Sequence, residues 1–223
     1  MREEWTSDGD HPSVDGYQRL AEVAFREIVR NLVREEHFQG AVVVVAALAL
    51  DEVLPWGGWP EAALTELLLP VDGIGELHLL LPTLARLTQA SQDIAVVAPP
   101  YLPYPAGWRQ GGVDFAHVHL IDANARDALW ASEQCLRAGC LAAVLCWPGH
   151  ADDRALRRLQ VAADTGGVMG FAFRDLKVAR NPSPAALRIA IETAPAQLRV
   201  LKCRGGLAPA RAIAFPIHAP AAA

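Results

Sequence analysis

A glycine-bearing turn is the part of this sequence whose residue spacing comes closest to a catalytic pattern. It reads PVDGIGEL, from Pro70 to Leu77, and it follows the apolar run of residues 63–69. A turn of this kind between a strand and a helix is where many proteins hold a phosphate, because backbone N–H groups there point at the anion. The chemistry to test is therefore nucleotide binding and hydrolysis.

The residues of this turn do not suit nucleotide hydrolysis. The pattern GxxxxGK[ST] supplies a lysine that neutralises phosphate and a hydroxyl that binds magnesium. With Gly75 as the second glycine, Pro70 stands at the first, and Pro70 has no backbone N–H. Glu76 and Leu77 stand where the lysine and the hydroxyl residue would be. We therefore expect a degenerate phosphate loop (Pro70, Gly73, Gly75 and Glu76), no cofactor and no enzymatic activity.

The second half of a nucleotide site is also absent from the pattern. P-loop ATPases hold magnesium with an aspartate at the end of a later apolar strand. The apolar run of residues 140–146 is followed by Trp147 and Pro148 instead. Another apolar run does end in an acid, Asp122, for which the alternative role is a helix N-cap.

Histidine and cysteine are present, but their spacing does not indicate a metal site or a nucleophile. His117 and His119 would share one face of a strand, with no acid or cysteine nearby at ligand spacing. The cysteines form no CxxC pair, and we expect them to be buried free thiols in a reducing compartment. They are Cys135, Cys140, Cys146 and Cys203.

Aromatic and basic residues elsewhere are candidates for contacts with a partner protein or DNA. Trp56 and Trp59 flank a Gly-Gly turn, and the alternative for both is packing at the start of the domain. Lys202, Arg204 and Arg211 gather near the C-terminal end, where they could touch DNA or an acidic partner.

Short apolar runs that alternate with helical patterns position these residues. Uninterrupted apolar strands between helices are typical of a parallel sheet covered on both faces, so we expect an α/β fold. The last two segments alternate apolar and polar residues around a short Pro-containing turn, which predicts an antiparallel hairpin. The expected strands are residues 63–69, 93–100, 115–122, 140–148, 167–175, 185–194 and 197–206, and the expected helices are residues 74–90, 124–138 and 151–165.

Composition favours a folded protein without a broad affinity for anionic surfaces. Of 223 residues, 52% are hydrophobic and 20% are charged, which is typical of a globular domain. The net charge of −5 gives no basic field that would attract nucleic acid or an acidic membrane. The acidic start and the short apolar run of residues 40–50 predict neither a signal peptide nor a membrane span, which favours the cytoplasm. We expect a disordered N-terminus (1–13), an N-terminal helix (14–40), a main domain (41–215) and a flexible tail (216–223).

Six separated segments between residues 50 and 206 carry a family resemblance. They are LPWGGWP (54–60), LTELLLP (64–70), GIGELHLLLPTLARL (73–87), IAVVAPPYLPY (94–104), CLRAGCLAAVLCWP (135–148) and LRVLKCRGG (198–206). In this order they resemble ImuA, the RecA-like accessory protein of the bacterial ImuA–ImuB mutagenesis cassette.

The resemblance to ImuA implies a fold and a function. The fold would be RecA-like, with a mainly parallel sheet between helices and no ATPase activity. The protein would act in SOS-induced translesion synthesis and mutagenesis, after DNA damage. Its partners would be an ImuB-type inactive relative of Y-family polymerases and an error-prone DnaE-type polymerase. RecA, DNA and further copies of the chain are additional possible partners.

Two alternatives to this function stay open at the level of the sequence. The same core resembles SulA, the SOS-induced cell-division inhibitor that binds FtsZ. SulA is shorter and lacks a GGWP lead-in and a long C-terminal extension, which favours ImuA. The second alternative is an ATP-binding recombinase paralogue with other nucleotide contacts. That alternative requires a cation near Gly75, yet the first lysine in the chain is Lys177.

Overall fold

The computed structural model describes residues 38–215, with side chains from residue 46 onward. The expected disordered start, nearly all of the expected N-terminal helix and the expected tail lie outside these residues. The described residues from Val43 onward belong to one compact unit. The expected domain start at residue 41 stays a prediction.

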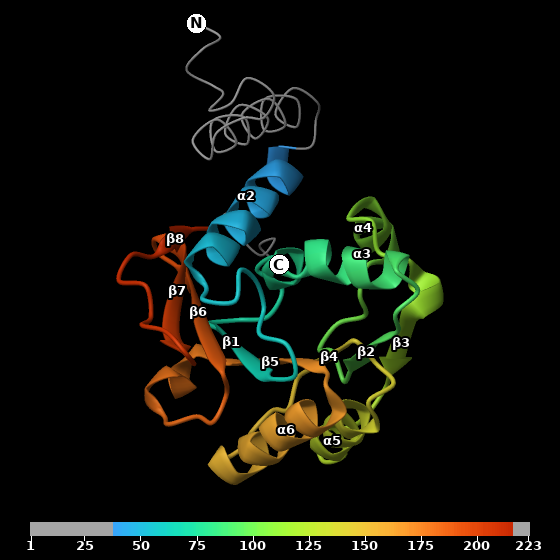
Figure 1. Ribbon diagram of the computed structural model, residues 1–223. Coiled ribbons are helices and arrows are strands. Elements are labelled where there is room, and N and C mark those ends of the chain that lie inside the picture. The colour runs from blue at the N-terminus through green and yellow to red at the C-terminus, as the bar shows by residue number, and fades with distance from the viewer. Residues whose placement is uncertain (1–37, 216–223) are drawn as a thin grey trace, which may run out of the picture. The chain divides into compact units, whose positions relative to one another are not determined.

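Eight strands of the described residues form a single sheet in the order β3-β2-β4-β5-β1-β6-β7-β8 (Figure 1). Neighbouring strands from β3 to β6 in this order are parallel, whereas β7 and β8 pair antiparallel. The expected α/β fold, with a mainly parallel sheet and an antiparallel C-terminal hairpin, is confirmed. The strands are β1 (Leu64–Leu69), β2 (Ile94–Val97), β3 (Val118–Ile121), β4 (Ala143–Cys146), β5 (Met169–Asp175), β6 (Leu187–Thr193), β7 (Ala196–Cys203) and β8 (Ile213–Ala214).

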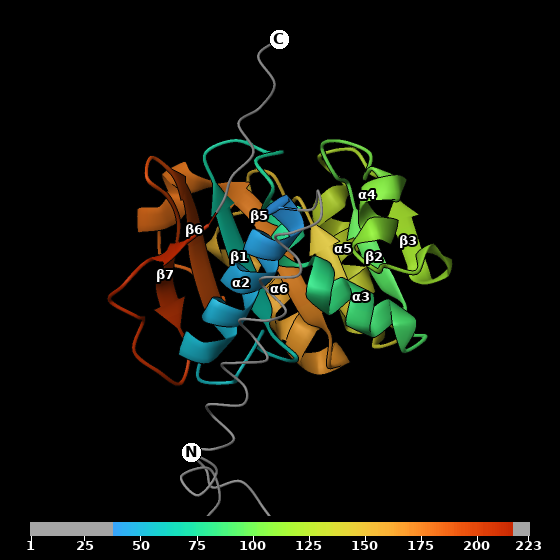
Figure 2. The same cartoon turned by 90° about the horizontal axis from the view of Figure 1, so that it is seen from above.

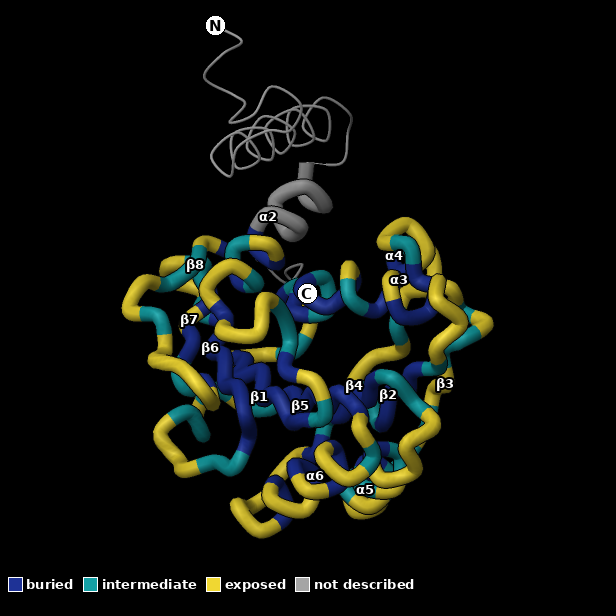
Figure 3. The backbone as a smooth tube through the Cα atoms, in the orientation of Figure 1, coloured by how far each residue is buried: buried dark blue, intermediate teal, exposed yellow. Residues whose placement is uncertain are grey.

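Helices cover both faces of this sheet. Figures 1 and 2 show α2 and α3 over one face and α5 and α6 against the other. Because both faces are covered, β1, β2 and β4 are buried at every residue (Figure 3). The helices are α2 (Phe38–Val53), α3 (Leu81–Gln89), α4 (Pro105–Gln110), α5 (Ala128–Ala138) and α6 (Asp153–Gly166).

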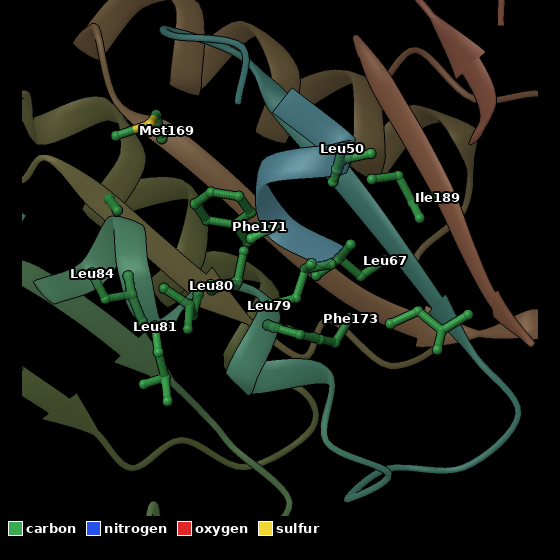
Figure 4. Packing of buried hydrophobic residues seen from close by; sticks show 14 of the residues in the cluster. Leu50, Leu67, Leu79, Leu80, Leu81, Leu84, Met169, Phe171, Phe173 and Ile189 are labelled. Atoms are coloured by element: carbon green, nitrogen blue, oxygen red, sulfur yellow. The ribbon is translucent and has the colours of Figure 1, made fainter. Parts of the chain in front are cut away.

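The larger hydrophobic core lies between the sheet and helices α2 and α3. Leu67 of β1, Phe171 of β5 and Ile189 of β6 come from three adjacent strands and contribute to it (Figure 4). Leu50 of α2 and Leu84 of α3 close it from the helix layer. This packing fixes β1, and with it the glycine turn at its end, relative to the neighbouring strands.

A smaller core lies between the sheet and helices α5 and α6. Leu64 of β1, Val144 of β4 and Leu159 of α6 belong to it, and all three are fully buried. The two helices meet at the last residue of α6, Gly166. A Cβ atom there would lie 2.0 Å from the carbonyl oxygen of Leu136. Only glycine fits at this contact, because a side chain would push the two backbones apart.

The helix after the glycine turn begins later than expected. The pattern predicted a helix over residues 74–90, but a short 3₁₀ helix, η2 (Glu76–Leu79), precedes α3. Gly75 has φ of 99°, a left-handed conformation that an α-helix cannot include. Pro82 then occupies the first turn of α3, where a missing backbone N–H is tolerated.

Two other boundaries also differ from the prediction. The helix expected over residues 124–138 begins at Ala128, and Asp122 does not cap it. Instead, the side-chain oxygen of Asn124 accepts two backbone N–H groups of the turn before the helix. Strand β3 likewise begins only after a 3₁₀ helix, η3 (Phe115–His117). In both places local side-chain hydrogen bonds set the start of the element.

Helix α2 runs through the valine-rich segment, which the sequence pattern left unassigned. Ala46, Ala47 and Leu50 are buried and fall at steps of one and three residues, so one face of α2 covers the sheet. The short elements α4 and β8 were not predicted either. Within residues 38–215, no helix is long and apolar enough to cross a membrane.

The expectation of four buried thiols is only partly right. All four cysteines are free, and Cys146 and Cys203 are buried. Cys140 is exposed and Cys135 is half-buried, because both lie near the end of α5. Burial raises the pKa of the Cys146 thiol to about 12, so this thiol is uncharged and unreactive at neutral pH.

Candidate functional site

The carboxyl ends of β1, β4 and β5 form the edge of the sheet at which ligands of open α/β folds bind. Two cavities lie there. The first, here the acidic cavity, has a volume of about 590 Å³ and is lined by residues that follow these three strands. The second, here the apolar cavity, has a volume of about 230 Å³ and lies between the glycine turn and the segment that leads from β2 into α4. Trp147 and Pro100 line both cavities.

The glycine turn is closed by its own carboxylate. The backbone N–H of Gly73 donates a hydrogen bond of 3.0 Å to Oε1 of Glu76. Gly73 and Gly75 have φ of 85° and 99°, which brings the chain back on itself, and Glu76 is only 3% exposed. A backbone donor of the kind that would face a phosphate in a working P-loop therefore already faces a negative charge.

An aromatic residue, not an acid, follows β4, the strand where a P-loop ATPase would carry a magnesium-binding aspartate. Trp147, which follows β4, stacks on Phe173 of β5, with ring centroids 4.3 Å apart and planes 9° apart. Asp122 follows β3 at the edge of the sheet, and strands β2, β4 and β5 lie between it and β1. The acidic strand end seen in the sequence is therefore far from the glycine turn.

Three acidic side chains line the first cavity, together with Arg174 and Lys177. Asp152 caps α6 by accepting the backbone N–H of Ala155 at 2.7 Å. Asp175 is paired with Lys177, with 3.1 Å between Oδ2 and Nζ. Asp72 has no such basic partner among the described residues. Burial, followed by the nearby charge of Glu76, raises its pKa above the usual 3.8.

Replacing Asp72 by asparagine should stabilise the protein increasingly as pH rises. A carboxyl whose pKa is raised by folding favours the folded state below its ordinary pKa of 3.8, and it loses that contribution as pH rises through the raised value. The asparagine side chain cannot ionise. The free energy of unfolding of the variant should therefore rise relative to that of the parent protein as pH rises from about 4 to neutrality. Urea unfolding at several pH values measures this. A difference that does not change with pH would contradict it.

A buried ion cluster joins three strands beneath the acidic cavity. Glu66 of β1 is fully buried and accepts hydrogen bonds of 2.6 Å from Arg174 of β5 and from Arg188 of β6. Arg174 also donates to the carbonyl of Ala151 at 2.6 Å, and Arg188 donates to three carbonyls of the η4 region (η4, Leu176–Arg180, and the residue after it). The cluster therefore fixes the segments after β4 and β5 that line the cavity.

The two tryptophans proposed as partner contacts differ in their surroundings. Trp59 is half-buried and packs edge-on against Phe171, with centroids 5.3 Å apart and planes 87° apart. Trp56 is 41% exposed. The geometry of Trp59 favours the packing alternative, while a partner role for Trp56 stays a prediction.

The proposed basic cluster does not lie at the glycine turn. Lys202 and Arg204 lie at the end of β7, which pairs with the start of β6 and so lies toward the opposite end of the sheet. Their side chains donate to the carbonyls of Ser183 and Pro184, at 2.6 and 3.3 Å. Arg211 is exposed and precedes β8. A contact of these residues with DNA or a partner stays a prediction.

The histidines of the η3–β3 segment share a carboxylate that the sequence spacing did not reveal. Nδ1 of His117 lies 2.8 Å from Asp93, and Nε2 of His119 lies 3.5 Å from it. The hydrogen bond from His117 lowers the pKa of Asp93. Across residues 38–215, no group of three or more His, Cys, Asp or Glu side chains is placed to hold a metal ion.

The turn residues named from the sequence line the two cavities, Pro70 the acidic one and Gly73, Gly75 and Glu76 the apolar one, but sequence reasoning missed other residues that shape them. Tyr101, Leu102 and Tyr104 line the apolar cavity, and their only signal was a proline-rich segment without charge. Glu66 was visible as an acid inside an otherwise apolar strand. Such an acid requires a buried basic partner, but nothing in the sequence identified Arg174 and Arg188 as those partners.

No protein-family model matches the chain, and no curated protein matches it. Among solved structures, the chain is similar to SulA from Pseudomonas aeruginosa, with 27% sequence identity and a TM-score of 0.43. The match covers 52% of this chain and 98% of the SulA chain.

Proposed function

We propose that this chain is a non-catalytic accessory protein with a RecA-like fold that acts in SOS-induced translesion synthesis and mutagenesis. It would work through contacts with an ImuB-type polymerase relative and an error-prone DnaE-type polymerase. The proposal that the protein is not an enzyme rests on the closed glycine turn, in which Glu76 accepts the N–H of Gly73. A turn whose donor already faces a buried carboxylate does not cradle a triphosphate.

The architecture supports a relative of P-loop proteins that has lost its chemistry. β1 lies inside the sheet, with β5 on one side and β6 on the other, and it is followed by the glycine turn, the short 3₁₀ helix η2 and then α3. This is the strand–turn–helix arrangement of a phosphate loop. The acids that line the acidic cavity, Asp72, Asp152 and Asp175, add further negative charge at the position of the missing nucleotide.

The role in mutagenesis is supported by the order of the sequence segments that resemble ImuA. Several of these segments meet at the same edge of the sheet. The segment LTELLLP forms β1 and the first residue of the turn. The segment GIGELHLLLPTLARL runs from the turn through η2 into α3. The segment IAVVAPPYLPY forms β2 and one wall of the apolar cavity. Three of the six segments therefore contribute residues to this edge of the sheet, which suits a protein that acts by binding there.

Parallel binding assays test this function. The purified full chain is titrated with an ImuB-type protein, with FtsZ and with magnesium ATP, and heats of binding are recorded. We expect binding to the ImuB-type protein and none to FtsZ or ATP. Binding to FtsZ alone would replace the proposal with the division-inhibitor function. Saturable binding of ATP would replace it with the recombinase-paralogue function.

A further inference from the structure

We propose that the apolar cavity binds a segment of a partner protein in which an arginine or lysine is flanked by apolar residues. This deepens the proposed function, and it rests on that function only for the expectation that the occupant is a protein. The proposal combines a buried carboxylate oxygen, exposed aromatic side chains around it and an excess of negative charge.

The carboxylate of Glu76 is the first observation. Glu76 lines the apolar cavity and is 3% exposed. Its Oε1 atom accepts the N–H of Gly73, but its Oε2 atom is buried and accepts no hydrogen bond from the described residues. A buried acceptor without a donor costs free energy, which a donor from a ligand would remove.

The aromatic wall of the cavity is the second observation. Tyr101, Leu102 and Tyr104 are 69%, 79% and 72% exposed, although they belong to residue types that are usually at least partly buried. The segment from Pro99 to Pro105 contains four prolines, which restrict its backbone. It therefore presents these side chains to a ligand in a fixed arrangement, which lowers the entropic cost of binding.

The charge balance selects a basic ligand. The nearby cations already contact acids, because Lys177 contacts Asp175 and Arg174 shares the carboxylate of Glu66 with Arg188. Asp72, which lines the adjoining acidic cavity, has no basic partner among the described residues, and Glu76 lines the apolar cavity together with His78. A phosphate or nucleic-acid backbone would be repelled by these acids, whereas a cation would be attracted.

An arginine or lysine between apolar residues fits each of these features. Its charged group would donate to Oε2 of Glu76, and a hydrogen bond between two charged groups is stronger than a neutral one. The faces of Tyr101 and Tyr104 offer cation–π contacts to the same group. The neighbouring apolar residues would cover Leu102 and Trp108, which line the cavity. This is how small apolar pockets with one polar anchor achieve specificity.

Two matched peptides test the proposal without any natural partner. The probes are acetyl-Ala-Leu-Arg-Leu-Leu-Ala-amide and the same peptide with glutamine in place of arginine. Each is titrated into the ¹⁵N-labelled full chain while amide and indole N–H signals are followed by NMR. We expect at least about tenfold tighter binding of the arginine peptide, and shifts confined to the glycine turn, Tyr101–Tyr104 and the indole of Trp147.

Two variants separate the carboxylate from the apolar wall. Glu76→Gln should remove the preference for arginine, and Leu102→Ala should weaken both peptides alike. Leu102 is largely exposed, so its variant keeps the test valid even if Glu76→Gln does not fold. Equal affinity of the two peptides, no binding at millimolar concentration, or shifts located elsewhere would each overturn the proposal.

A segment of the same chain is the competing occupant. Arg26, Arg30 and Arg34 stand among apolar residues in the part of the sequence that precedes the described structure. If the full chain binds neither peptide but a variant with these arginines changed to glutamine does, the occupant is this segment and not a partner. If the chain binds the arginine peptide but no ImuB-type protein, this inference is supported and the proposed function is wrong.

Discussion

Replacing Glu66 by glutamine should lower the free energy of unfolding by about 3–5 kcal/mol, because it leaves two buried arginines without their counter-charge. Arg174 and Arg188 are 7% and 6% exposed, and each lies 2.6 Å from a different oxygen of Glu66. Water cannot replace the lost charge at this depth. Chemical denaturation of parent and variant measures the difference.

An exposed ion pair provides the control for Glu66. Asp153 and Arg157 are one helical turn apart on α6, are 51% and 68% exposed, and lie 3.4 Å apart. Asp153→Asn should cost less than about 1 kcal/mol, because water screens such pairs. Equal effects of the two substitutions would contradict the assignment of Glu66 as a buried counter-charge.

A second test of the Glu66 cluster removes all three charges together. Glu66→Leu combined with Arg174→Met and Arg188→Met should recover much of the stability that Glu66→Gln loses, because apolar side chains of similar volume often replace a buried ion triad without loss. The loop of η4 should become less ordered in this variant, since Arg188 donates to the carbonyls of Val178, Ala179 and Asn181. Hydrogen exchange of that loop reports the change.

Replacing Phe171 by alanine should lower the free energy of unfolding by about 3–5 kcal/mol, as is usual for a buried aromatic side chain. Phe171 is 1% exposed and lies on β5, which pairs with both β1 and β4. Its ring fills the core between the sheet and helices α2 and α3 (Figure 4). Val161→Ala, at a position 51% exposed on α6, should change stability by less than about 0.5 kcal/mol.

The same substitution also decides the role of Trp59. Trp59 and Phe171 are in edge-to-face contact, so a double-mutant cycle with Trp59→Ala should give a coupling energy of about 0.5–1.5 kcal/mol. A coupling near zero would show that Trp59 contributes little to the core, and it would return Trp59 to the candidates for partner contact.

The sequence by itself determined the layers of the fold and the residue types of the glycine turn. β2 and β4 are read from uninterrupted apolar runs, and β1 from a run in which only Thr65 and Glu66 are polar, since a strand buried on both faces tolerates few polar residues. The C-terminal hairpin is read from its alternating pattern around a short turn. That Glu76 and Leu77 replace a lysine and a hydroxyl residue is a property of the chain alone, and no packing restores those groups.

Only the tertiary structure decided which distant residues meet. Glu66 contacts Arg174 and Arg188 across 108 and 122 residues, because β1 lies between β5 and β6. The sequence also left open that the carboxylate of Glu76 turns inward to close its own loop, and that Tyr101 stays exposed beside it. Local patterns report the period and burial of a segment, whereas contacts between segments depend on the order of the strands and on the direction in which each turn leaves the sheet.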